Sequence, residues 1–155
     1  MICIMKTLSI DYGEARTGLA ISDYTGTIAS PLTVLPERNI NTLIEKIIYI
    51  AKENEVTQIV VGNPINMDGT KGEKSLKCEE LADKLRDCSD VPVAVWDERL
   101  TTVSAQRIKN ENRNAQLGVK SRRRRTASGG CPLDAVAAAL ILESYLTYKK
   151  NKALS

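Results

Sequence analysis

Short apolar segments separated by turn-forming residues make up the first 35 positions of the chain. Alternation within these segments predicts three consecutive strands, over residues 2–10, 16–23 and 28–34. Because only short turns separate them, the strands should form an antiparallel meander. Pro31 lies inside the third segment and cannot donate a hydrogen bond to a neighbouring strand. We therefore expect this strand at the edge of a sheet or interrupted by a bulge.

After Pro36 the pattern changes, and helical spacing of apolar residues alternates with short apolar runs. This predicts helices over residues 39–54, 73–88, 101–110 and 132–149, strands over 58–62 and 91–96, and loops over 63–72 and 112–130. Asn39 or Asn41 is expected to cap the first helix. The order predicts an α/β fold in which a mixed five-stranded sheet, with three antiparallel strands and then parallel strands, is flanked by helices. Residues 1–155 are expected to form a single domain.

The composition is that of a globular protein and excludes several kinds of catalysis. The chain has 155 residues, of which 43 % are hydrophobic, with four cysteines and no histidine. The absence of histidine excludes Ser-His-Asp and Cys-His catalysis and any histidine-metal site. The cysteines form no CxxC pair and are expected to be reduced thiols. No apolar run approaches the roughly 20 residues of a membrane span, so we expect a cytoplasmic protein without membrane contact.

The charge is distributed unevenly along the chain. Residues 99–125 contain nine basic residues and one acid, a net charge of +8, whereas the whole chain carries +3 and the remainder therefore −5. Such asymmetry indicates a polyanionic partner. Its densest part comprises Lys120, Arg122, Arg123, Arg124 and Arg125. This cluster is either a solvated loop or, as its place before Asp134 favours, a flap that binds phosphates in a salt-dependent way.

Three carboxylates lie where they could converge on one site. Asp11 ends the first strand, Glu98 follows the fifth, and Asp134 falls in the first turn of the last helix. Each also has a simpler reading: a turn residue, a charged turn before a helix, and a carboxylate that complements a helix dipole. Because residues 135–139 are all small, the last helix could pack close to the sheet and bring Asp134 towards the strand ends. Carboxylates of this kind suit Mg²⁺, which points to a metal-dependent enzyme acting on phosphodiesters.

Two further residues next to Glu98 have alternative roles. Side chains alternate along a strand, so only one of Asp97 and Glu98 should face the site, and we expect it to be Glu98. Arg99 could bind a phosphate through two hydrogen bonds or could pair with Asp97. The loop from Gly62 to Gly69 reads as a simple turn region or as a segment that lines the site.

Five motifs in this order resemble the YqgF/RuvX family over essentially the whole chain. They are Asp11-Tyr12-Gly13, the Gly18-x-Ala20-x-Ser22-Asp23 segment after Arg16, Gly62-x-Pro64 with Gly69, the block from Asp97 to Thr102, and Asp134-x-x-Ala137-Ala138. The resemblance implies an RNase H-like fold and a nuclease. Its members are described as Holliday-junction resolvases and as nucleases that mature the 5′ end of pre-16S rRNA.

The resemblance also implies the roles of individual residues. Asp11, Glu98 and Asp134 become the catalytic carboxylates that bind Mg²⁺ or Mn²⁺ for two-metal hydrolysis. The expected substrate contacts include the motif residues Arg16, Arg99, Thr101 and Thr102. They also include the basic cluster, which is expected to bind phosphates because of its charge and position and comprises Lys120, Arg122, Arg123, Arg124 and Arg125.

Several functions stay open on the sequence. The first is an endonuclease on structured RNA, namely precursor 16S rRNA, and the second a resolvase of DNA four-way junctions. A resolvase cuts two strands symmetrically and should be a dimer, whereas the sequence predicts a monomer or weak homodimer. A non-catalytic nucleic-acid-binding module is disfavoured by the clustered carboxylates, which are costly without a metal. An actin-like nucleotide-binding protein would need two such domains, and this chain supplies one.

Overall fold

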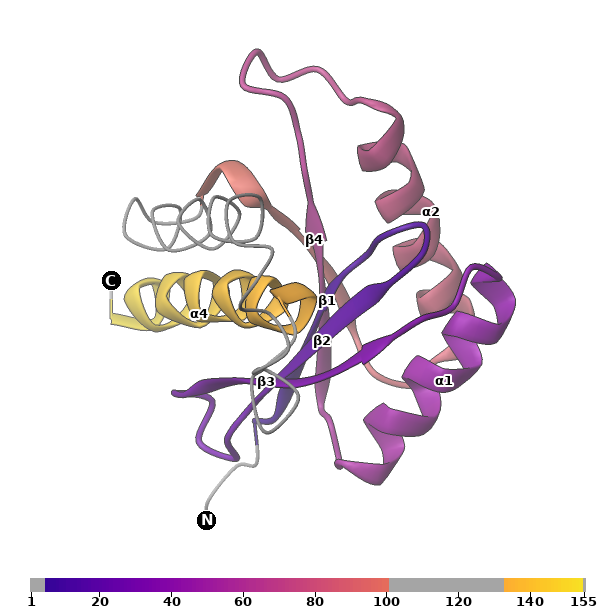
Figure 1. Ribbon diagram of the computed structural model, residues 1–155. Coiled ribbons are helices and arrows are strands. Elements are labelled where there is room, and N and C mark those ends of the chain that lie inside the picture. The colour runs from indigo at the N-terminus through magenta and orange to yellow at the C-terminus, as the bar shows by residue number, and fades with distance from the viewer. Residues whose placement is uncertain (1–4, 101–132, 155) are drawn as a thin grey trace, which may run out of the picture.

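A five-stranded mixed sheet forms the centre of the computed structural model, which describes residues 5–100 and 133–154 (Figure 1). The strands are β1 (Thr7–Asp11), β2 (Thr17–Ser22), β3 (Ala29–Leu35), β4 (Gln58–Asn63) and β5 (Val93–Asp97). They lie in the order β3-β2-β1-β4-β5, with β1, β2 and β3 antiparallel and β4 and β5 parallel to β1. The predicted mixed sheet is therefore confirmed.

Helices cover both faces of the sheet. They are α1 (Ile40–Glu53), α2 (Glu73–Cys88) and α4 (Leu133–Leu154), with a short 3-10 turn at Glu98–Leu100. In Figure 1, α1 and α2 lie on one side of the sheet and α4, in yellow, on the other. Asn39 is the N-cap of α1, and its side chain accepts hydrogen bonds from the backbone N–H groups of Asn41 and Thr42. Of the two predicted caps, it is therefore Asn39 that serves this helix.

The two faces contain separate apolar clusters. Leu8, Ile10, Ile59 and Val61 point to the α1 and α2 side, whereas Val60 points to α4. This is the alternation expected of strands that are buried on both faces. Ser9, on the α4 face, donates its hydroxyl hydrogen to the carbonyl of Ala138 at 2.6 Å. A side chain thus hydrogen-bonds directly to the α4 backbone, which shows how closely that helix lies on the sheet.

The third strand has both features that Pro31 predicted. It is an edge strand, and its pairing with β2 shifts register where Leu19 pairs with Thr33 and Ala20 with Pro31. Leu32 is the extra residue, which makes this a β-bulge. An edge strand tolerates the missing N–H of proline, and among the described strands none lies beyond β3.

Element boundaries differ from the prediction at several ends. Strand β5 spans Val93–Asp97 instead of 91–96, and the last helix reaches Leu154 instead of residue 149. Pro92 explains the later start of β5, because its backbone offers no N–H to the ladder, although its carbonyl still accepts from Ile59 at 2.9 Å. The predicted helix 101–110 and loop 112–130 lie outside the described residues.

Candidate active site

Three parallel strands end together at one edge of the sheet, which we call the acidic edge. Asp11 is the last residue of β1, and β5 ends at Asp97, which pairs with Asn63 of β4. Because Ser9 and Val60 face α4, strand alternation places Asp11 and Gly62 on that face as well. Asp11 and Gly62 follow the paired residues Ile10 and Val61, so they lie side by side at the strand ends.

Glu98 lies against this edge because Gly62 leaves space for it. A Cβ atom added at Gly62 would come within 2.9 Å of Oε1 of Glu98 and 2.6 Å of Cδ1 of Ile141. The carboxylate of Glu98 therefore lies over the end of β4, next to Asp11. This orientation favours Glu98 over Asp97 as the residue that faces the site.

Asp134 reaches the same edge through a backbone contact between α4 and β2. A Cβ atom at Gly18 would lie 1.9 Å from the carbonyl oxygen of Asp134 and 2.8 Å from the backbone nitrogen of Ala135. Gly18 is the direct partner of Asp11 in the β1–β2 ladder. The first turn of α4 therefore lies on the residue beside Asp11, and the small side chains that follow Asp134 permit this approach.

Arg99 pairs with Asp97, which was one of its two predicted roles. Its Nε and Nη2 atoms donate to the Asp97 carboxylate at 2.7–3.1 Å, and its backbone N–H donates at 2.9 Å. The guanidinium group lowers the pKa of Asp97 below its ordinary value, and Asp97 raises that of Arg99. Nη1 also reaches the carbonyl of Asn66 at 3.5 Å. Arg99 thus links the end of β5 to the loop between β4 and α2.

Three residues at the edge were given no role of their own from the sequence, although Asn63 lies in the loop from Gly62 to Gly69 that was one candidate for lining the site. Asn63 is buried and accepts a hydrogen bond from the Ser75 hydroxyl at 2.5 Å, which fixes the start of α2 against β4. Cys78 is buried beneath the edge; burial raises its pKa to about 12, and Glu98 and Asp11 contribute to the rise. Lys74 is the cation that opposes that rise. A polar residue after a buried strand was the available signal for Asn63, whereas nothing in the sequence marked the other two.

The remaining predicted site residues are distributed as follows. Arg16 is exposed in the turn before β2. Outside the described residues lie Thr101, Thr102, Lys120, Arg122, Arg123, Arg124 and Arg125.

Carboxylate oxygens at this edge are the ligands that Mg²⁺ and Mn²⁺ prefer. Within residues 5–100 and 133–154, no three acidic or cysteine side chains lie close enough together to form a ready-made metal cluster. Magnesium usually takes only one or two protein carboxylates and completes its shell with water and substrate phosphate. The donor set therefore fits such an ion, and the metal role of Asp11, Glu98 and Asp134 stays a prediction.

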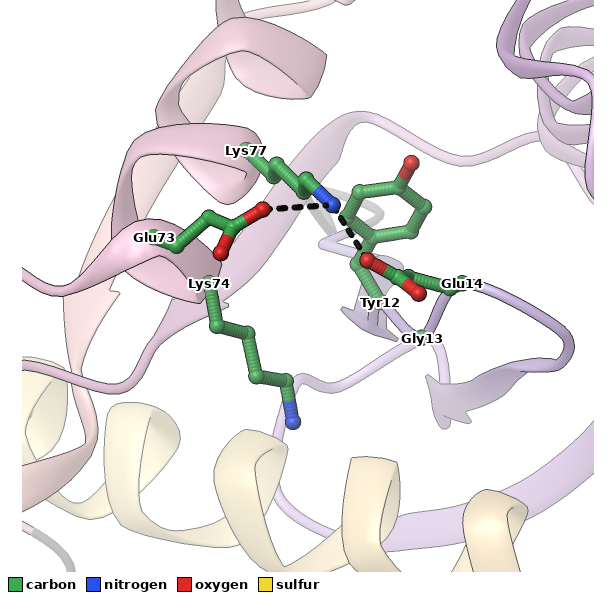
Figure 2. Close-up of a pocket in the computed structure, with 6 residues that line it drawn as sticks. All are labelled: Tyr12, Gly13, Glu14, Glu73, Lys74 and Lys77. Carbon is green, nitrogen blue, oxygen red and sulfur yellow. Dashed lines mark hydrogen bonds and ion pairs between the residues drawn. The ribbon is translucent and has the colours of Figure 1, made fainter.

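A cavity of about 400 Å³ lies beside the acidic edge. It is lined by Tyr12, Gly13, Glu14, Glu73, Lys74 and Lys77 (Figure 2). Lys77 bridges the two acids across it, because its ammonium group pairs with Glu14 of the β1–β2 turn and with Glu73 of α2. Two segments that are some 60 residues apart in the sequence are thereby joined at the mouth of the site.

Two solved structures that share this fold are complexes with Holliday junction DNA. Thermus thermophilus RuvC in complex with a Holliday junction substrate matches with a TM-score of 0.64 at 14 % identity, over 96 % of both chains. A fowlpox virus resolvase in complex with Holliday junction DNA matches with a TM-score of 0.55 at 13 % identity, over 94 % of this chain and 99 % of that one. The sheet order and these matches thus define an RNase H-like fold, as predicted.

Sequence relatives narrow this class to one family. The family model described as "RuvX: Holliday junction resolvase" matches residues 5–148, and the chain belongs to this family. A relative from Ruminiclostridium cellulolyticum is 40 % identical over 92 % of this chain and 94 % of its own length. Another, from Thermoanaerobacter pseudethanolicus, is 38 % identical over 96 % and 100 %. Both carry the name "Putative pre-16S rRNA nuclease".

No helix within the described residues is long and apolar enough to cross a membrane.

Proposed function

We propose that the chain is a divalent-metal-dependent endonuclease that hydrolyses phosphodiester bonds in the 5′ region of precursor 16S rRNA. The observation that carries the proposal is the pair of glycine contacts at the acidic edge. Gly62 makes room for Glu98, and Gly18 makes room for the backbone of Asp134, both beside Asp11. Relatives that bear the pre-16S rRNA nuclease name over nearly their full length support the substrate.

In this proposal Asp11, Glu98 and Asp134 hold Mg²⁺ or Mn²⁺ against the substrate phosphate. Bound ions of this kind activate a water molecule and stabilise the leaving oxygen. The chain's own residues fix the geometry: Asp11 through its strand end, Glu98 through its turn, and Asp134 through the first turn of α4. Asp97 is engaged by Arg99, which leaves it a supporting role. The basic cluster from Lys120 to Arg125 binds flanking phosphates, and the protein acts in the cytoplasm as a monomer or weak homodimer.

The second candidate is a resolvase of DNA four-way junctions. The family description and the fold neighbours favour it, since both neighbours were solved with or named for junction DNA. A resolvase should be dimeric, because it cuts two strands related by symmetry. Cleavage products and oligomeric state together therefore distinguish the two candidates.

The test is a cleavage assay with Mg²⁺ or Mn²⁺ on a 5′-extended 16S rRNA fragment and on a DNA four-way junction. We expect metal-dependent cutting of the RNA, lost with EDTA and lowered at least about 10²-fold in Asp11→Asn, because a preorganised charge in the site is removed. Symmetric cutting of the junction alone would establish the resolvase. Cutting of neither substrate, by protein shown to be folded by circular dichroism, would refute the nuclease proposal.

A further inference from the structure

The cavity beside the acidic edge has an uneven arrangement of charge. Its lining contains two lysines, and one of them, Lys77, is already held in ion pairs with Glu14 and Glu73. Lys74 lines the cavity but forms no ion pair or hydrogen bond with any other residue in the described ranges. Figure 2 shows its side chain extended away from the Glu73–Lys77–Glu14 group.

Lys74 lies on the part of α2 that faces the acidic edge. It is one helical turn before Cys78, so the two side chains share a face of the helix. Cys78 is buried and lies within electrostatic range of Asp11, Glu98 and Lys74. Lys74 is an exposed positive charge in the cavity lining, and it would attract a polyanion to a place whose other charges are held in ion pairs.

The start of α2 adds to this attraction. Gly72 is its N-cap and supplies no side chain to accept a hydrogen bond from the first turn. The N-terminal end of a helix carries partial positive charge, and Lys74 is the second residue of this 16-residue helix. Tyr12 and Gly13, directly after Asp11, form the opposite wall of the cavity. One wall of the cavity therefore begins at the residue directly after Asp11, the candidate catalytic carboxylate at the end of β1.

We propose that this cavity binds one nucleotide of the substrate strand next to the cleaved bond, with Lys74 as the contact to its phosphate. The proposal rests on the proposed nuclease function. A volume of about 400 Å³ lies within the range of sites for small ligands. Lysine contacts phosphate as a point charge on a flexible stem, so the contact fixes position and carries no sequence information. Lys77 cannot take the same role without breaking its pairs with Glu14 and Glu73.

The experiment compares Lys74→Gln, Lys74→Arg and a matched control, Lys84→Gln. Lys84 is a cation of the same helix that pairs with Glu80 at 3.6 Å and is absent from the cavity lining. A labelled 5′-extended 16S rRNA fragment is titrated by fluorescence anisotropy in buffer with Ca²⁺ at several salt concentrations. Cleavage is measured in parallel with Mg²⁺. The same titration with a DNA four-way junction tests whether the contact depends on the kind of nucleic acid.

The slope of log affinity against log salt is negative, and we expect Lys74→Gln to make it less steep by about 0.7–0.9. We also expect this variant to bind about five- to eightfold more weakly at 0.1 M salt. Lys74→Arg should restore both, and Lys84→Gln should leave them close to wild type. Cleavage by wild type together with equal slopes for Lys74→Gln and Lys84→Gln would overturn the subsite and leave the nuclease function standing. Wild-type protein that neither binds nor cuts either nucleic acid would overturn both.

Discussion

The two faces of the sheet differ in how their helices pack near the acidic edge. Towards α1 and α2, large aliphatic side chains such as Leu43, Ile47 and Leu81 are fully buried. Towards α4, the buried cluster also contains large side chains such as Leu142 and Tyr145, but the contacts nearest the start of the helix are made by Gly18, Ser9 and alanines, with backbone atoms of the helix against the strands. The face towards α1 and α2 is filled by large side chains, and we call it the volume-filling face. On the face towards α4, close contacts set the distance between the start of the helix and the strands, and we call it the distance-setting face. We infer that the first mainly stabilises the fold, whereas the second positions Asp134.

The largest expected effect tests the distance-setting face. In Gly18→Ala the new methyl group would overlap the backbone of Asp134 and Ala135, and backbone atoms cannot move aside cheaply. The start of α4 should shift, which we expect to lower cleavage about 10²-fold and stability by about 1–3 kcal/mol. Cleavage rate and urea unfolding of the same preparation measure both. Full activity in this variant would show that the close approach of α4 is unnecessary.

A substitution in the volume-filling face should lower stability strongly and cleavage very little. Leu81→Ala creates a cavity in the cluster under α2, and we expect it to cost about 2–5 kcal/mol of stability. Cleavage per folded molecule should stay within about twofold of wild type, because the contacts that place Asp134 are untouched. Urea unfolding with cleavage assayed well below the unfolding midpoint separates the two quantities. A loss of activity as large as that in Gly18→Ala would remove the distinction between the faces.

A smaller effect is expected at Gly62, which also lies on the α4 face. Here an added methyl group meets the ends of two flexible side chains, Glu98 and Ile141, which can move. We expect Gly62→Ala to lower cleavage about tenfold by displacing Glu98, with a stability change below about 1.5 kcal/mol. In a Glu98→Gln background the same substitution should add little, because both changes act on one carboxylate. If the losses of cleavage in this double-mutant cycle were additive, Gly62 would act through a contact other than Glu98.

The smallest effect concerns the ion pair between Asp97 and Arg99, which belongs to neither face. Since Arg99 lowers the pKa of Asp97, the pair stabilises the protein above the unfolded-state pKa of about 3.9 and loses this contribution as pH falls through the lower folded-state pKa. The difference in urea midpoint between wild type and Asp97→Asn should therefore be larger near pH 6 than near pH 3. Packing of the two faces does not depend on pH in this way. A difference in urea midpoint that does not change with pH would contradict the assigned pairing of Asp97 with Arg99.

The order of elements was predictable because each strand and helix carries its own pattern of apolar residues. Pro31 also allowed the edge position and the bulge of β3 to be predicted, and Asn39 was one of two predicted N-caps, because proline and an N-cap act through local backbone chemistry. The position of Glu98 followed from strand alternation, although its role as a ligand rests on the family resemblance. Gly18 and Gly62 stood out only as members of the family motifs, and the sequence did not show which contacts they permit, because those contacts come from a distant part of the chain. The pairing of Lys77 with Glu14 was invisible for the same reason.

The bulge at Leu32 has a consequence for self-association. Edge strands offer unpaired backbone groups to other chains, and a proline with an extra residue makes β3 a poor template for such pairing. Two copies of this protein should therefore not join their sheets edge to edge through β3, and any homodimer would need another surface. The same irregularity should protect the protein from aggregating into extended sheets during folding, when that edge is first exposed.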